Sequence, residues 1–131
     1  MAKYIDGFVL VVPKNKVKDY KKMAEEGKEM WMQNGALEYY ECMGDDLKPK
    51  SMGGMKPLAF TKMAKAKANE TVWFSFVVYK SKKHRDEVNK KVMDEMNEKY
   101  KDQDPKKFKM PFDMERMAYG GFSVEVEGGN N

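Results

Sequence analysis

The chain is poor in the residues that build the most easily recognised sites. Its 131 residues include one cysteine, Cys42, and one histidine, His84. A single cysteine excludes a disulfide within the chain, and one cysteine with one histidine leaves no plausible zinc site. The sequence also lacks a phosphate-binding loop, a dinucleotide fingerprint and an ordered Ser-His-Asp series. We therefore expect no metal and no cofactor.

Long apolar runs are missing as well. No stretch approaches the roughly 20 apolar residues of a membrane-spanning helix. The first residues have the pattern of a strand and not that of a basic and then apolar leader peptide. We expect a soluble cytoplasmic protein with no membrane partner. The length fits one domain with a modest core, predicted over residues 1–127, followed by a disordered tail over 128–131.

Charge of one sign is also scarce. Charged residues make up 35% of the chain, yet the net charge is only +4 because lysines and acids are interleaved. Interleaving is typical of solvated helix faces, whereas a nucleic-acid surface needs a concentrated basic patch. Methionine, by contrast, is abundant, with 13 residues. This flexible side chain fills irregular cores and also occurs on adaptable binding surfaces.

Hydrophobic periodicity predicts a small α+β fold. Strands are expected at residues 4–12, 36–44, 71–80 and 116–127, and helices at 14–34 and 81–100. With right-handed crossovers, this β-α-β-β-α-β order predicts a ferredoxin-like antiparallel sheet with two helices on one face. Asn15 is a possible helix cap, Gly35 suits a helix end, and Gly120-Gly121 indicates a bulge or a close backbone approach. The long excursion over 45–69 includes a possible short helix at 57–67 and is typical of a lid or a binding segment.

The third strand, Val72–Tyr79, is almost wholly apolar and aromatic, which predicts burial on both faces. Alternation places Trp73, Ser75, Val77 and Tyr79 on one face and Phe74, Phe76 and Val78 on the other. Because helices need room to approach, we assign the face that carries Ser75 and Gly7 to the helices. The open face then carries the following large side chains: Phe8, Leu10, Val12, Phe74, Phe76 and Val78.

An open face this apolar needs a cover. One candidate is RNA, because residues 74–79 resemble the last six positions of an RNA-recognition motif, although Val72 and Trp73 replace its basic residue and glycine. The other candidate is a second copy, since two such sheets packed face to face form a homodimeric α+β barrel. The second copy requires no basic rim, so we prefer it.

Several side chains are candidates for chemistry on the helix side. His84, in the first turn of a helix, is suited to act as a neutral general acid or base, or else bonds a nearby carboxylate. Trp73, Ser75, Tyr79 and Tyr39 are expected to line a pocket that suits a small apolar or aromatic ligand. Each of them has ordinary core packing as its alternative.

Acids and the thiol give weaker signals. Glu38 and Glu41 lie on opposite faces of one strand, so one of them, which we assign to the pocket as Glu41, is expected in a less exposed environment. Asp6 is a candidate buried acid. Cys42 is expected to be a buried, inert thiol, and Arg116 is expected to pair with Asp113 or with a ligand carboxylate.

Specific segments resemble the YbaA-like family of uncharacterised proteins. They cover most of the chain: Tyr4–Leu10, Gly35–Tyr39, Glu41-Cys42, Gly44–Asp46, Phe74-Ser75, Val78–Ser81, His84–Asp86, Val88-Asn89, Lys91–Met93, Met110–Asp113, Arg116-Met117 and Tyr119–Phe122. The match departs between Lys48 and Asn69, where this chain is longer and richer in Met and Lys. The resemblance implies a member of the dimeric α+β barrel superfamily, hence a homodimer with a pocket between sheet and helices. It also implies small-molecule binding with cofactor-free oxygenase- or isomerase-like chemistry, or a non-catalytic stress or regulatory role.

Overall fold

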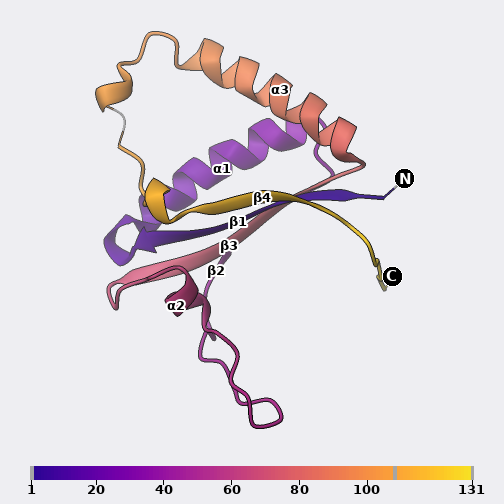
Figure 1. The fold of residues 1–131 in the computed structure, drawn as a ribbon. Coiled ribbons are helices and arrows are strands. Elements are labelled where there is room, and N and C mark those ends of the chain that lie inside the picture. The colour runs from indigo at the N-terminus through magenta and orange to yellow at the C-terminus, as the bar shows by residue number, and fades with distance from the viewer. Residues whose placement is uncertain (1, 108, 131) are drawn as a thin grey trace.

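Four strands form one antiparallel sheet in the order β2-β3-β1-β4 (Figure 1). The strands are β1 (Tyr4–Pro13), β2 (Glu38–Met43), β3 (Glu70–Tyr79) and β4 (Ala118–Ser123). The long helices α1 (Val17–Gln33) and α3 (Lys82–Lys99) cover one face, and the single turn α2 (Phe60–Met63) lies on the other. This arrangement confirms the predicted ferredoxin-like α+β fold.

This computed structural model describes residues 2–107 and 109–130. Met1 of the predicted domain, Phe108 of its last loop and Asn131 of the predicted tail lie outside the described residues. The disorder predicted for the tail stays a prediction.

Local signals set the helix ends. α1 follows a short 3-10 turn, Lys14–Lys16, and begins without a side-chain cap, so the predicted capping role of Asn15 is wrong. Gly35 ends it with a φ of 109°, a backbone conformation that favours glycine. α3 begins at a true cap, because the Ser81 hydroxyl accepts a hydrogen bond from the backbone N–H of His84 at 3.1 Å.

Pairing between β1 and β3 decides which side chains face the helices. Phe8 lies opposite Ser75 and Leu10 opposite Trp73, so all four point to the helix side. The predicted placement of Phe8 and Leu10 on the open face, together with that of Val12, is therefore wrong.

The wrong phase of β1 came from Gly7, which the sequence analysis assigned to the helix side. Gly7 lies opposite Phe76 on the open face, and a Cβ there would meet the Phe122 ring at 3.5 Å. The absence of a side chain at Gly7 therefore makes room for the Phe122 ring on the open face and not for a helix. The phase predicted for β3 is confirmed, since Trp73 packs on the helix side whereas Phe74 is exposed on the other face.

Glycine also lets β4 approach β1. Gly120 and Gly121 pair with Gly7 and Asp6 in an unbroken register, which excludes a bulge at these residues. A Cβ on Gly121 would collide with the Tyr4 ring, so the close approach is confirmed as the reason for a glycine here.

The core lies mainly between the sheet and the two long helices. Its buried members from the helices are Tyr20, Ala24, Met30, Val88 and Val92. The last two stand one turn apart on α3, so they lie on the same face of that helix. A smaller cluster on the opposite side joins Val11 and Val72 to Ala64, just after α2.

A buried polar network ties α3 to the sheet. The Asp6 carboxylate is 2% exposed and accepts a hydrogen bond from the Arg85 guanidinium at 2.7 Å and one from Asn89 Nδ2 at 3.3 Å. Asn89 Oδ1 in turn accepts from the Tyr79 hydroxyl and the Trp31 indole, each at 3.1 Å. Asp6 is thus the buried acid that the sequence predicted, and its partners join α1, α3, β1 and β3.

We expect Arg85→Met to destabilise the fold by about 3 kcal/mol, because it leaves the Asp6 carboxylate buried without its cation. The free energy of unfolding from urea titration measures the change. Lys90→Met, which removes an exposed cation from the same helix, is expected to cost less than about 0.5 kcal/mol. Equal effects of the two substitutions would contradict a structural role for the Asp6–Arg85 pair.

Candidate functional site

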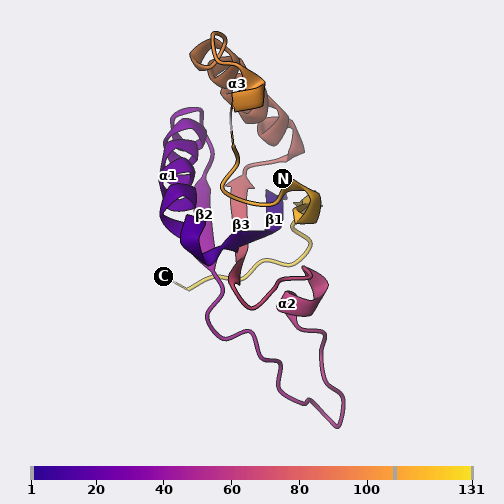
Figure 2. The ribbon, with the colours of Figure 1, turned by 90° about the vertical axis from the view of Figure 1, so that its left-hand side faces the viewer.

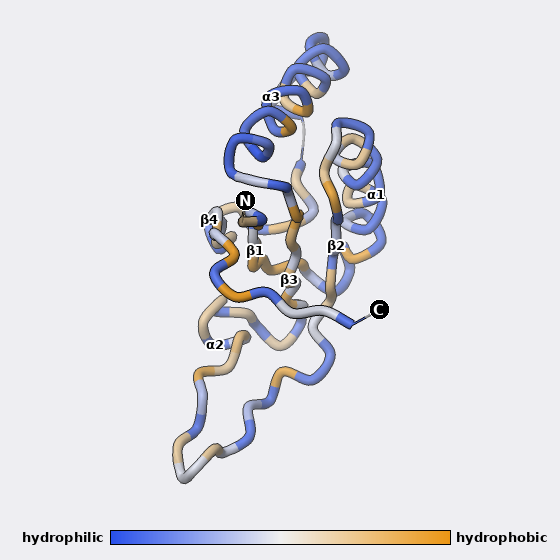
Figure 3. The backbone as a smooth tube through the Cα atoms, turned by 90° about the vertical axis from the view of Figure 1, so that its right-hand side faces the viewer, coloured by the Kyte–Doolittle hydropathy of each residue, from blue (hydrophilic) through white to orange (hydrophobic). Residues whose placement is uncertain are grey.

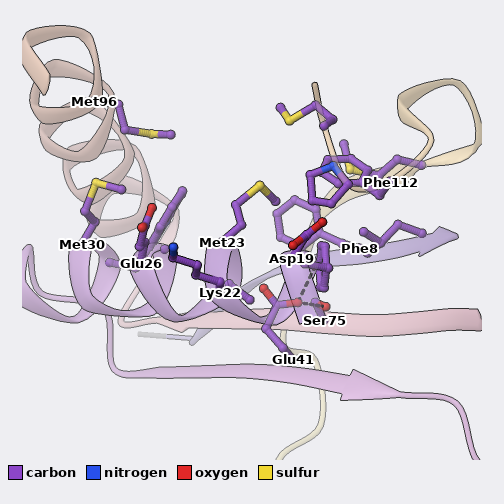
Figure 4. Close-up of a pocket in the computed structure, with 18 of the residues that line it drawn as sticks. Phe8, Asp19, Lys22, Met23, Glu26, Met30, Glu41, Ser75, Met96 and Phe112 are labelled. Atoms are coloured by element: carbon purple, nitrogen blue, oxygen red, sulfur yellow. Dashed lines mark hydrogen bonds between the residues drawn. The ribbon is translucent and has the colours of Figure 1, made fainter. Parts of the chain in front are cut away.

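A partly open cavity of about 820 Å³ lies between α1, the helix side of the sheet, the end of α3 and the segments 103–105 and 109–117 (Figure 4). Its walls are mainly apolar and include Leu10, Met23, Met30, Trp31, Met96 and Phe112. Both α1 and α3 thus contribute flexible methionines to the walls, a composition that adapts to ligands of different shape.

One carboxylate stands at the base of this cavity. Glu41 Oε1 accepts hydrogen bonds from the Tyr20 hydroxyl at 2.7 Å and from the Ser75 hydroxyl, and Oε2 accepts one from the Tyr39 hydroxyl at 2.7 Å. Three neutral donors thus compensate the partial burial of the charge, and among the described residues no ion pair to Glu41 forms. Oε2, which holds one of the three donors, keeps more capacity to accept from a ligand.

Three elements bring these groups together. Glu41 lies opposite Ser75 in the β2–β3 pairing, so both point to the helix side. Tyr20 comes from the beginning of α1, and its ring packs on that of Trp73 with centroids 4.8 Å apart. The carboxylate is thus held by a strand neighbour and by a packed helix residue, which fixes its direction.

The protonation state of the tyrosines follows from their surroundings. Burial raises the pKa of Tyr20 and of Tyr39 well above the ordinary value, and the negative charge of Glu41 raises both further. Both hydroxyls therefore stay protonated at physiological pH and donate to the carboxylate. The charged residues at the mouth, among them Asp19, Lys22 and Glu26 of α1, carry both signs and give it no uniform charge (Figure 4).

The structure divides the residues that the sequence assigned to the pocket. Tyr39, Ser75 and Glu41 line the cavity. Trp73 and Tyr79 share their face of the sheet but lie behind the lining, 3% and 0% exposed. The Trp73 indole donates to Thr71 Oγ1 at 3.0 Å, and the Tyr79 hydroxyl belongs to the Asn89 network.

His84 lies at the start of α3 and is not among the described residues that line the cavity. Its Nδ1 accepts the backbone N–H of Lys80 at 3.0 Å, and its ring meets the edge of Tyr79. The predicted acid/base role of His84 therefore lacks a geometric link to Glu41.

Several lining residues were not predicted for the site. Tyr20, Met23 and Trp31 belong to the apolar stripe of α1, whose spacing is the same whether it faces a solid core or a cavity. Phe8 and Leu10 line the cavity too, but they were not predicted for it because the wrong phase of β1 placed them on the open face.

Two other residues considered in the sequence analysis, Cys42 and Arg116, lie outside the cavity lining. Cys42 is exposed, on the open face beside Phe74, which corrects the predicted buried thiol. Arg116 pairs with Asp113 at 2.7 Å, as one alternative proposed, and also binds both carboxylate oxygens of Glu70 at 2.8 and 2.7 Å. This second partner was not predicted, because it lies 46 residues away in the sequence.

Within residues 2–107 and 109–130, no three His, Cys, Asp or Glu side chains gather in a group that could hold a metal ion. None of the helices formed by these residues combines the length and apolar character needed to cross a membrane.

Comparison with known proteins identifies relatives over nearly the whole chain. A family model described as "Protein of unknown function (DUF1428)" matches residues 3–114. The uncharacterized protein YbaA of Escherichia coli (strain K12) is 38% identical over 125 residues, covering 95% of this chain and 98% of that protein. YbaA of Shigella flexneri gives the same values.

Among solved structures, the crystal structure of a dimeric ferredoxin-like protein from an uncultured marine organism is similar. It aligns over 99% of this chain and 100% of that one, with a TM-score of 0.55 and 12% identity. At this identity the match shows the fold, and the dimeric state is a property of that protein.

The Arg116 cluster predicts a defined response to acid. Hydrogen bonds from Arg116, with a further one from the backbone N–H of Lys67, lower the pKa of Glu70 from 4.5 to about 2. A carboxylate with a lowered pKa in the fold contributes stability above its unfolded pKa and loses it as the pH falls through the folded value. The difference in unfolding free energy between wild type and Glu70→Gln should therefore be constant above pH 4.5 and shrink between pH 4.5 and 2.

Urea titrations from neutral pH down to pH 2 measure this difference, with the exposed Glu98→Gln as the control for loss of a surface carboxylate. A Glu70→Gln difference that does not depend on pH would contradict the assignment of Glu70 as the acid-sensitive group.

Proposed function

We propose that this chain, which belongs to the DUF1428 family of proteins of unknown function, binds a small, mainly apolar molecule that carries a hydroxyl or amino group. Membership of this family confirms the resemblance to YbaA-like proteins drawn from the sequence. The observation that carries the proposal is the Glu41 carboxylate, held by three hydroxyls at the base of an otherwise mainly apolar cavity.

Size and lining support a small ligand. A cavity of about 820 Å³ lies within the range of roughly 300–1,000 Å³ typical of small-molecule sites. Met23, Met30 and Trp31 offer an apolar wall along α1, and Phe112 offers one on the opposite side. An aliphatic or aromatic body fits between these walls, with its polar end toward the sheet.

The carboxylate selects the polar end of the ligand. Because Glu41 is an acceptor, it favours a ligand that donates a hydrogen bond, and a charged amino group gains a further charge-assisted contribution. Three accepting positions of the carboxylate are already filled by hydroxyls, so the site supports binding better than proton abstraction. Cofactor-free oxygenase- or isomerase-like chemistry would use this carboxylate and its tyrosines, and not His84.

We also propose that the chain forms a homodimer through the open face of its sheet. Tyr40, Phe74 and Phe76 form a row of aromatic rings there, with neighbouring centroids 4.9 and 5.6 Å apart. Phe74 is 47% exposed and Phe122, on β4, is 62% exposed in the single chain. Val78 shares this face but is already buried in the single chain. A solved structure of the same fold is described as dimeric, which supports a homodimer.

Ligand selectivity tests the role of Glu41. Phenylbutanol and phenylbutylamine should bind and change tryptophan fluorescence, because Trp31 lines the cavity, whereas butylbenzene, which lacks a donor, should bind more weakly. Glu41→Gln should weaken binding of the amine at least about 10-fold, since it removes the charged acceptor, and leave butylbenzene nearly unchanged. Glu25→Gln, an exposed site outside the cavity, is the matched control. Equal loss for amine and hydrocarbon would contradict the proposed anchor.

Oligomeric state tests the open face. Phe74→Glu should raise the dimer dissociation constant at least about 100-fold, because it places an unpaired charge in an apolar interface. Sedimentation velocity over a concentration series measures the constant, and circular dichroism checks the fold. Met93→Glu, at a comparably exposed site on α3, should leave the constant unchanged. A monomeric wild type that binds RNA with strong salt dependence would instead favour the RNA-recognition alternative.

A further inference from the structure

The segment between β2 and α2, residues 44–59, forms an arm that projects beyond the sheet (Figure 1). The view from the side shows it leaving the domain as an open loop whose two legs meet at a tight tip (Figure 2). The arm lies on the side of the sheet opposite α1 and α3.

Contacts on the open side of the sheet set its direction. The backbone N–H of Gly44 donates to the carbonyl of Val72 at 2.7 Å, and Leu47 packs on the small cluster of Val11, Val72 and Ala64. These contacts fix where the arm leaves the sheet.

The tip is a defined hairpin. Met52 and Met55 exchange backbone hydrogen bonds at 2.6 and 3.0 Å, and Gly53 and Gly54 between them have φ values of 56° and 82°. Positive φ at both central residues is typical of the two-residue turns that join β-hairpins. Because Met52 and Met55 are bridge partners, their side chains share one face of the hairpin.

Apolar side chains lie along the arm without cover in the single chain. Met52, Met55 and Leu58 are 69%, 75% and 65% exposed. Figure 3 shows apolar positions alternating with hydrophilic ones along this extended segment. A projecting hairpin that exposes methionines and a leucine between charged residues has the composition of an adaptable protein contact.

We propose that this arm clasps a second copy of the chain, an inference that rests on the homodimer proposed above. Two sheets packed face to face lie roughly 10 Å apart. Eight extended residues from the base to the tip span up to about 26 Å, more than twice that distance. An arm that leaves the open face in this direction therefore passes alongside the partner's sheet, where Met52, Met55 and Leu58 contact its apolar surface.

Photocrosslinking tests the contact directly. Benzoylphenylalanine in place of Met52 should crosslink two copies of the full chain, whereas the same probe in place of Met93, exposed on α3, should not. Mixing nitrogen-15-labelled and unlabelled chains identifies crosslinked peptides that join different copies. In parallel, the triple substitution Met52→Ser, Met55→Ser and Leu58→Ser should raise the dimer dissociation constant about 10-fold or more, with Met93→Ser as the control.

The outcomes separate the two proposals. A dimer by sedimentation that gives no crosslink between copies at position 52 would overturn the clasp and leave the homodimer intact. A monomer would overturn both. Binding of the arm to phosphatidylglycerol vesicles, lost in the triple variant and without crosslinks between copies, would replace the second copy with a lipid surface.

Discussion

The pairing of β1 with β3 decides which side chains reach the cavity and which reach the open face. Because side chains alternate along a strand, a slip of one residue would exchange the two sets. The observed register places Asp6 and Phe8 under the helices and puts Gly7 beneath Phe122. Asp6 reinforces this register, since its carboxylate finds Arg85 only on the helix side.

Two carboxylates on the helix side, Asp6 and Glu41, differ in their surroundings, and this difference gives one a structural role and places the other in the candidate site. Asp6 is almost fully buried and is satisfied by a cation and an amide, which leaves it no access to a ligand. Glu41 is only partly buried, faces a cavity and is held by neutral hydroxyls. Because the Glu41 charge forms no ion pair among the described residues and lies at the base of a cavity, Glu41 and not Asp6 can attract a hydrogen-bond donor of a ligand.

Sequence patterns predicted the fold well because β3 and both helices carry strong periodic signals. The phase of β3 was readable because Ser75 marks one face and two phenylalanines mark the other. β1 carries no comparable contrast: Ile5 and Val9 on one face and Leu10 on the other are equally apolar, so a wrong assumption about Gly7 inverted it. Two of the three hydroxyls around Glu41, those of Ser75 and Tyr39, belong to residues predicted for the pocket, whereas the third, Tyr20, depends on how α1 docks onto the sheet.

The cavity and the open face use alternate residues of the same two strands. On β2, the Glu41 side chain points to the helix side while that of Tyr40 points to the open face, and on β3 Ser75 lies between Phe74 and Phe76. A substitution of a side chain on one face therefore leaves those on the other in place, and the proposed ligand binding and the proposed dimer can be tested separately. Because both sets share one backbone, however, a ligand that displaced β2 or β3 would alter the affinity of the proposed dimer, and by linkage dimerisation would alter ligand affinity by the same factor.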